Sequence, residues 1–314
     1  MARVMMKGAE LLTTITWILL TPACAFRNPS IDHNNMTRHS FHFSSEISIN
    51  FDVSGEGARP LLLLHGFGAS MESWNDILPD LARMFRVYRL DLKGHGLSSK
   101  PRDGAYSISE QARIVAAFIR EYKLSNVTLI GHSYGGSVAL MTYVGFAESP
   151  ETNPVAKMVL IDCAGYPQEF PFFVSLLRKP VIGSLAQNLV PARVRAKYTL
   201  DRLFYDPSKI KQERIERYAR YFDLPGAHYA LSQCARQIIP ADVDTFLRKI
   251  PEIAVPTLIL WGANDSVIPL SIGRRLNRDI ASSQLVIIDG CGHVPQEEKP
   301  SEAVAVLLRF LGGG

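Results

Sequence analysis

The sequence predicts an α/β fold, namely a doubly wound, mostly parallel sheet that carries one helical insertion. Three observations support this fold class. Apolar runs of strand length alternate with helix-length segments from residue 47 to the end of the chain. Several of these runs are apolar at consecutive positions, as parallel strands covered on both faces are. The alternation stops once, between positions 162 and 257, and then resumes.

The expected strands and helices follow from these runs. The second helix starts with Ser107 and Ser109 as possible caps and has Glu110 in its first turn. The strands are expected over 47–53, 61–64, 86–91, 126–131, 155–162, 257–262 and 285–289, and the helices over 74–84, 107–123, 135–147, 270–281 and 301–311. The core of this α/β fold is therefore expected in two parts, residues 46–165 and residues 251–314.

Bulk composition limits the possible functions. The chain has 314 residues, of which 47% are hydrophobic and 20% charged, and its formal net charge is +4. These values are typical of a globular protein that is long enough for one domain with an insertion. No block of Lys and Arg resembles a nucleic-acid-binding arm, so we expect no nucleic-acid partner.

The first 25 residues predict a secretory signal peptide. Arg3 and Lys7 precede the apolar run 11-LLTTITWILL-20, and 23-ACA-25 places small residues before a cleavage point after Ala25. Two alternatives stay open, an uncleaved anchor and a lipid on Cys24, because 20-LTPAC-24 loosely resembles a bacterial lipobox. We therefore expect an exported protein, secreted or periplasmic, that meets a membrane only through this segment. The polar residues 26–45 predict an irregular spacer.

The interval 166–250 predicts a helical insertion. Its helix-like stretches are interrupted by prolines and are rich in Phe and Tyr. A structureless loop of this length is uncommon in a compact domain. Because open α/β sheets bind ligands beyond the carboxyl ends of their strands, and the insertion leaves from such an end, we expect a lid over the site. An accessory bundle remote from the site is the alternative.

Residues suited to acyl transfer follow the predicted strands. Ser133 stands between glycines in 131-GHSYGG-136, which is typical of a nucleophile on a sharp strand-to-helix turn. The motif alone would also fit a plain tight turn. A serine nucleophile needs a base, for which His293 is the candidate, and the base needs an acid. Asp265 is the leading acid, with Asp162 and Asp289 as rivals.

Five motifs together resemble one known family. They are 65-HGFG-68, 91-DLKGHGLSSKP-101, 131-GHSYGG-136, 262-GANDSVIP-269 and 290-GCGHVPQEEKP-300. From about residue 47 to 311 the chain resembles α/β-hydrolases of the lid-bearing esterase, lipase and C–C hydrolase group. The family's order Ser, Asp, His agrees with Ser133, Asp265 and His293. A minority of the family takes its acid from the position of Asp162.

The resemblance and local geometry also indicate the oxyanion hole. Its donors are expected to be the backbone N–H groups of Tyr134 and Phe67, with both rings lining an acyl pocket. The loops that carry them are expected to be supported by His65, Gly66, Gly68, Gly131 and Gly135. His132 is expected to point away from the nucleophile, and therefore not to be the base.

The leading hypothesis is a serine hydrolase that cleaves carboxylic esters through an acyl-enzyme on Ser133. Its substrate is expected to be a small ester with an apolar acyl or aryl group, and no cofactor or metal is expected. The alternatives are a C–C bond hydrolase, a group that typically has Asn where this chain has His132, and a non-catalytic binding protein. Cys163 and Cys291 are expected to be free thiols, since two strand spacings of about 4.8 Å exceed the reach of a disulfide.

Overall fold

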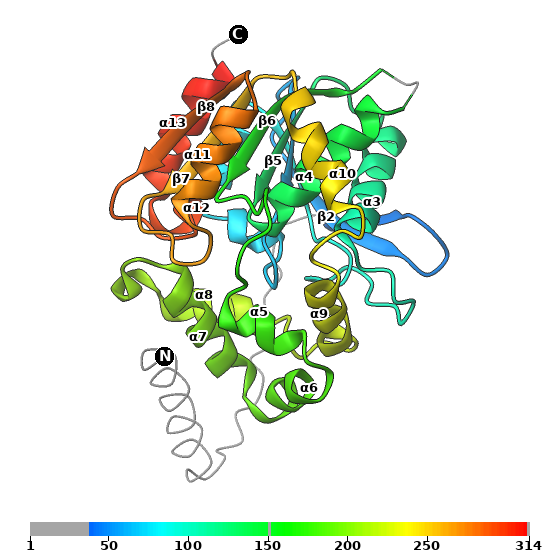
Figure 1. Ribbon diagram of the computed structural model, residues 1–314, viewed down its shortest axis with the longest axis vertical. Helices are drawn as coiled ribbons and strands as arrows, with labels where there is room; N and C mark the ends of the chain where they lie inside the picture. The colour runs from blue at the N-terminus through cyan, green and yellow to red at the C-terminus, as the bar shows by residue number, and fades with distance from the viewer. Residues whose placement is uncertain (1–37, 150–151, 313–314) are drawn as a thin grey trace. The chain divides into compact units, whose positions relative to one another are not determined.

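The computed structural model of the protein describes residues 38–149 and 152–312 (Figure 1). Its strands form one eight-stranded sheet in the order β1-β2-β4-β3-β5-β6-β7-β8. The two antiparallel pairings are β1 with β2 and β2 with β4, and all the other pairings are parallel. The strands are β1 (Arg38–His42), β2 (Ser48–Ser54), β3 (Pro60–Leu64), β4 (Arg86–Leu90), β5 (Val127–His132), β6 (Val155–Ile161), β7 (Thr257–Gly262) and β8 (Ser283–Ile288). The predicted mostly parallel, doubly wound sheet is confirmed.

Helices cover both faces of this sheet, which explains why the strands are apolar at consecutive positions. Leu62 and Leu64 of β3 pack in a core cluster with α3, α4, α10 and α11, whereas Leu61 and Leu63 pack with η1, α2 and α13. Successive side chains of a strand point to opposite faces of the sheet, and both sets are buried because helices cover both faces. The helices are η1 (Met71–Trp74), α2 (Leu78–Ala82), α3 (Ile108–Glu121), α4 (Tyr134–Ala147), α10 (Val243–Lys249), α11 (Leu270–Asp279), α12 (Pro295–Glu298) and α13 (Pro300–Gly312).

The prediction of an irregular spacer over 26–45 is wrong at its carboxyl end. β1 occupies Arg38–His42 and pairs with β2 at the edge of the sheet. Only Phe41 of this strand is buried, where its ring packs edge-on against Phe118 of α3. An edge strand with a single large buried side chain has no run of apolar residues. Its polar sequence therefore resembles that of an irregular spacer. The predicted signal peptide over 1–25 and Cys24 lie outside the described residues.

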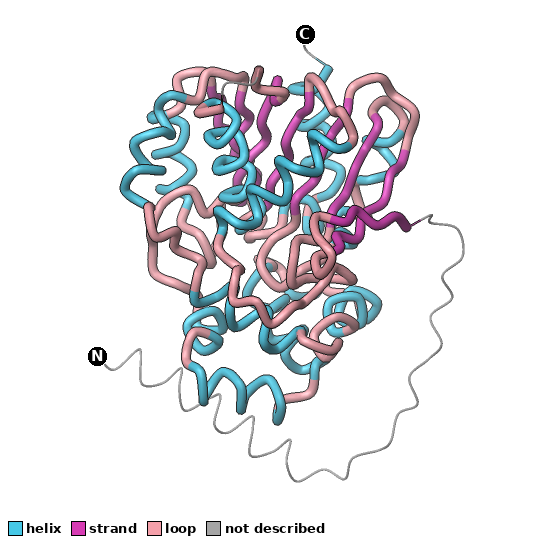
Figure 2. Tube along the Cα trace, turned by 90° about the vertical axis from the view of Figure 1, so that its right-hand side faces the viewer, coloured by secondary structure: helices cyan, strands magenta, loops and turns pink. Residues whose placement is uncertain are grey.

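A set of helices is inserted between β6 and β7, as predicted. Figures 1 and 2 both place this insertion at one end of the sheet, the end at which β6 leads into it. Phe246 of α10 packs in the sheet's own core cluster, so the last of these helices belongs to the core. The remaining elements of the insertion are α5 (Phe172–Leu177), α6 (Pro180–Leu189), α7 (Ala192–Leu203), η2 (Pro207–Lys209), α8 (Gln212–Ala219) and α9 (Ala227–Arg236), with η3 (Ile250–Glu252) following α10.

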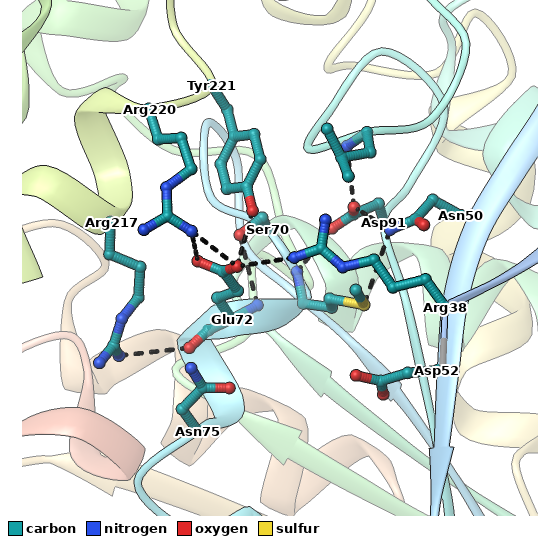
Figure 3. A network of polar contacts seen from close by, with 12 residues as sticks. Arg38, Asn50, Asp52, Ser70, Glu72, Asn75, Asp91, Arg217, Arg220 and Tyr221 are labelled. Atoms are coloured by element: carbon teal, nitrogen blue, oxygen red, sulfur yellow. Dashed lines mark hydrogen bonds and ion pairs between the residues drawn. The ribbon is translucent and has the colours of Figure 1, made fainter. Parts of the chain in front are cut away.

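A polar network around Glu72 of η1 joins the insertion to the core (Figure 3). The Tyr221 hydroxyl donates to Glu72 Oε1 over 2.7 Å, and the Arg220 guanidinium lies 3.2 Å from the same oxygen. Arg38 of β1 approaches that oxygen from the sheet side at 3.3 Å. Arg217 of α8 donates to the Glu72 carbonyl. Arg220 and Tyr221 of the insertion therefore bind the Glu72 carboxylate of the core.

None of the helices within the described residues is long and apolar enough to cross a membrane.

Candidate active site

Ser133 lies on the sharp turn between β5 and α4. Its backbone angles are φ 52° and ψ −116°, a conformation that costs energy in a residue with a side chain. Two glycines make this turn possible. A Cβ on Gly131 would lie 2.4 Å from the Gly135 carbonyl oxygen, and a Cβ on Gly135 would lie 2.2 Å from the Leu64 oxygen. The turn predicted from the sequence therefore exists, and its glycines are required by close backbone contacts.

His293 and Asp265 form a buried hydrogen-bonded pair, although 28 positions separate them. His293 Nδ1 lies 2.7 Å from Asp265 Oδ2. The backbone N–H groups of Val267 and Ile268 both donate to Asp265 Oδ1. Burial raises the pKa of Asp265, but the charge and hydrogen bond of His293 outweigh burial, and the net shift is downward. Asp265 is therefore an anion held in place by three donors, and it leaves His293 Nε2 available.

The two rival acids differ in position. Asp289 is exposed in the turn after β8. Asp162 is fully buried at the end of β6 and accepts the Gly262 N–H over 3.0 Å. Asp162, Asp265 and His293 have atoms within 4.8 Å of one another, the one set of this kind among the described residues that could hold a metal ion. The direct His293–Asp265 hydrogen bond explains their proximity without an ion.

Three other histidines are built into the surrounding loops. His65 Nε2 accepts the Leu92 N–H, so its Nδ1 carries the proton and donates to the Gly66 carbonyl. His132 Nε2 donates to the carbonyl of His293 over 2.8 Å. Burial and the neighbouring His293 lower the pKa of His132 to about 3. His132 is thus a neutral donor that braces the His293 loop, and its ring does not act as the base in this arrangement. His95 is likewise buried, with its pKa well lowered by burial.

The backbone positions predicted for the oxyanion hole meet at the same place. Tyr134 is the first residue of α4, where an N–H has no partner within the helix and the helix dipole favours negative charge. Phe67 and Gly66 lie in the loop after β3, and both line the cavity that contains Ser133. Gly68 of the same loop has φ +70°, which favours glycine. The Phe67 and Tyr134 rings contact each other edge-on, at 6.2 Å between centroids.

A cavity with an empty volume of about 1030 Å³, part of it open to solvent, contains Ser133 and His293. The insertion and the sheet loops line it together. Its walls carry Phe, Tyr, Ile, Leu and Val side chains, and the described residues that line it include no Lys, Arg, Asp or Glu. The large apolar members include Phe67, Phe170, Phe173, Leu203, Ile238 and Phe246. The site is therefore apolar apart from the catalytic candidates and a few neutral polar groups.

The insertion is bonded to the loop that carries His293. The His293 N–H donates to the Leu203 carbonyl over 2.7 Å. Glu298 of α12, which is buried, accepts the N–H groups of Gly292 at 2.7 Å, Tyr205 at 3.0 Å and Asp206 at 2.8 Å. The sequence analysis missed this role of Glu298. The signal was present in 290-GCGHVPQEEKP-300, where an acid follows the histidine loop, but nothing in the sequence shows that its partners lie ninety residues earlier.

Cys163 and Cys291 are free and buried, as expected. They follow β6 and β8, and β7 lies between these strands in the sheet.

The strand order, the turn at Ser133 and the helices on both faces define an α/β hydrolase fold. The family described as alpha/beta hydrolase fold matches residues 59–300. The chain belongs to this family and is a hydrolase of this fold.

Similar proteins of known sequence differ in activity. The chain is 31% identical over 263 residues to the dihydrolipoyllysine-residue acetyltransferase component of the acetoin cleaving system of Pseudomonas putida; the match covers 83% of this chain and 65% of that protein, less than two thirds of its length. It is 27% identical over 271 residues to a 2-hydroxy-6-oxo-2,4-heptadienoate hydrolase of Pseudomonas putida, covering 84% of this chain and 93% of that one.

Among solved structures, an alpha/beta hydrolase fold protein from Burkholderia ambifaria is similar, with a TM-score of 0.75 and 26% identity. The match covers 89% of this chain and 98% of that chain. Sequence and structure therefore agree on the fold, while the relatives span more than one reaction.

Proposed function

We propose that the protein is a serine hydrolase that cleaves neutral, apolar carboxylic esters through an acyl-enzyme on Ser133. His293 is the general base and Asp265 its acid partner. The N–H groups of Phe67 and Tyr134 form the oxyanion hole. The observation that carries the proposal is one apolar cavity that contains Ser133 and His293, with His293 Nδ1 bonded to a buried Asp265.

The reaction proceeds in two half-reactions. His293 Nε2 takes the Ser133 proton as Oγ attacks the ester carbonyl, and the oxygen of the tetrahedral intermediate is bound by the two N–H groups. The imidazolium then protonates the leaving alcohol, which departs and leaves the acyl-enzyme. Water attacks this ester and gives its proton to His293, and collapse of the second tetrahedral intermediate releases the carboxylic acid while His293 returns the proton to Ser133. Asp265 holds the tautomer and stabilises the imidazolium throughout.

The cavity walls support the substrate class. A neutral acyl or aryl group gains about 25 cal/mol for each Å² of apolar surface that it buries. An ionised group in the same place would lose its hydration without a counter-ion, because none of the described lining residues is a Lys or Arg. Esters of neutral, apolar acids are therefore favoured over esters whose acyl part is charged.

The second candidate is a C–C bond hydrolase, favoured by the similarity to a 2-hydroxy-6-oxo-2,4-heptadienoate hydrolase. A dienoate substrate carries a carboxylate, and a carboxylate in an apolar cavity calls for an Arg or Lys partner. The cavity wall described above offers none. This chemistry supports ester cleavage over the C–C reaction.

We also propose that α5–α9 act as a lid. Phe170, Phe173 and Tyr218 of the insertion line the cavity, so the insertion closes it opposite the sheet. The end of α7 and the residues that follow it are bonded to the His293 loop, which anchors this side of the lid.

The test compares wild type with Ser133→Ala on p-nitrophenyl esters of increasing acyl length, a succinate half-ester of matched length and a 2-hydroxy-6-oxo-dienoate. Ser133→Ala is expected to lower kcat by on the order of a million-fold. Ser137→Ala is the matched control, because Ser137 lines the same cavity but donates its hydroxyl to the Ala164 carbonyl. Ester hydrolysis that survives Ser133→Ala, or preference for the dienoate, would overturn the proposal.

A further inference from the structure

Asp162 is a buried carboxyl group that the mechanism above does not use. It follows β6, is fully buried, and adopts a left-handed φ of 42°, which is uncommon for a residue other than glycine. Its Oδ1 accepts the Gly262 N–H over 3.0 Å. Among the described residues, no N–H or O–H donor reaches its Oδ2. A buried carboxylate oxygen without a donor is costly, so the state of Asp162 needs an explanation.

The neighbour that matters is Asp265. Atoms of Asp162, Asp265 and His293 all lie within 4.8 Å of one another. Two carboxyl groups at this distance, both taken out of water, do not ionise together, because the second charge is opposed by burial and by the first charge. One proton is therefore held by the pair at neutral pH.

The hydrogen bonds decide which carboxyl group holds that proton. Asp265 accepts from two backbone N–H groups and from His293, and each of these donors stabilises its charge. Asp162 accepts from one backbone N–H. The pKa of Asp162 is correspondingly raised by its burial and by Asp265, whereas the net shift of Asp265 is downward. Asp265 is therefore the ionised carboxylate, and Asp162 is the neutral carboxylic acid that holds the proton.

We propose that Asp162 stays a neutral carboxylic acid and donates its Oδ2 hydroxyl to the Asp265 carboxylate. In this way Asp162 positions the carboxylate that orients His293. The proposal rests on the proposed function of Asp265 and His293. Asp162 is a positioning residue in this scheme, since it acts through Asp265 and touches no substrate. The strained backbone at position 162 fits such a role, because strain of this kind is kept where a side chain must be aimed.

The other titratable groups that face this pair are neutral. Cys163 and Cys291 are buried thiols whose pKa values are raised, chiefly by burial. His132 is neutral, with its pKa lowered to about 3. Among the described groups around Asp162, the charge at neutral pH is therefore carried by Asp265, and by His293 when it is protonated.

The kinetic test compares the pH profile of kcat/KM for wild type, Asp162→Asn and Asp162→Ala on one p-nitrophenyl ester. The Asn amide still donates and is neutral, so we expect the acid limb, which reports His293, to stay at the same pH. Asp162→Ala loses one hydrogen bond to a charged group, and kcat is expected to fall about 10- to 100-fold. If Asp162 were an anion, Asp162→Asn would remove a negative charge near His293 and move the acid limb to lower pH, which would overturn the proposal.

A second measurement needs no activity and so separates this proposal from the proposed function. The native protein holds the Asp162 proton, whereas the unfolded chain releases it above about pH 4. The wild type is therefore expected to lose folding stability relative to Asp162→Asn as pH rises from about 4, by up to tenfold in the folding equilibrium constant for each pH unit, until the raised native pKa is reached. Asp289→Asn, at an exposed position, is the control. A constant difference between wild type and Asp162→Asn across this range would contradict a neutral Asp162.

Discussion

Ser133 combines two properties that are unfavourable on their own, a left-handed backbone conformation and a hydroxyl that needs activation. The conformation costs about 1–3 kcal/mol and persists because β5 and α4 fix both sides of the turn. In the proposed mechanism, the hydroxyl gains reactivity from His293, whose Nδ1 is hydrogen-bonded to Asp265. At the scale of single residues, the proposed chemistry depends on hydrogen-bond donors and acceptors that the buried backbone holds in position before the substrate binds.

Asp265→Asn tests the acid of this pair. An amide in place of the carboxylate favours the wrong tautomer of His293 and no longer stabilises the imidazolium, so kcat is expected to fall on the order of 10⁴-fold with little change in KM. Steady-state kinetics on a p-nitrophenyl ester measure this. Asp289→Asn, the rival acid in an exposed turn, should leave kcat unchanged. The reverse pattern would assign the role to Asp289.

At the scale of elements, two of the three glycines of α4, Gly135 and Gly145, have opposite expected effects on stability. A Cβ at Gly135 would lie 2.2 Å from the Leu64 carbonyl oxygen, whereas a Cβ at Gly145 would meet nothing within 4 Å. The start of α4 is thus pressed against the end of β3, and this contact sets the position of the nucleophile turn. The far end of the same helix has no such restriction.

We expect Gly135→Ala to lower the free energy of unfolding by about 3 kcal/mol, since backbone must shift to admit the methyl group. Gly145→Ala, in the same helix, should be neutral or raise that free energy by up to about 1 kcal/mol through helix propensity. Urea denaturation of both variants measures these changes in the free energy of unfolding. The rate at which a fluorophosphonate labels Ser133 measures the effect on the nucleophile turn. Equal stabilities would show that the contact between α4 and β3 is not restrictive.

At the scale of the whole described molecule, the insertion and the core meet through charges as well as apolar walls. Glu298 joins the His293 loop to the chain that follows α7, and Glu72 joins η1 to the segment after α8 (Figure 3). Both are core acids that accept from the insertion. The proposed lid is therefore anchored at the side nearest the base.

Glu298→Gln tests this anchoring. The amide keeps one acceptor oxygen but presents an NH₂ group to a backbone N–H, so at least one of three hydrogen bonds is lost. We expect about 2 kcal/mol less stability and a lower kcat, because the Gly292 N–H of the His293 loop no longer donates to a charged carboxylate. Glu302→Gln is the matched control, since Glu302 is an exposed partner of Lys299 whose pair contributes little. An unchanged kcat in Glu298→Gln would contradict the expectation that the hydrogen bonds of Glu298 affect catalysis.

Local patterns in the sequence were sufficient to predict the fold and the proximity of Ser133, Asp265 and His293 in the candidate site. Consecutive apolar positions predicted strands buried on both faces, and five motifs at strand ends predicted that Ser133, Asp265 and His293 converge. Contacts that depend on distant parts of the chain could not be predicted in this way. β1 has one inward side chain, Glu298 has partners in the insertion, and the neutral state that we propose for Asp162 depends on how many donors reach each carboxyl group.

The most direct test of the proposed function is to trap the acyl-enzyme. The protein is mixed with p-nitrophenyl butyrate, quenched in acid within milliseconds, and examined by intact mass and peptide mapping. We predict a burst of p-nitrophenol with one butyryl group on the peptide that contains Ser133, and neither in Ser133→Ala. A butyryl group on another residue, or turnover by Ser133→Ala at the wild-type rate, would contradict the acyl-enzyme mechanism.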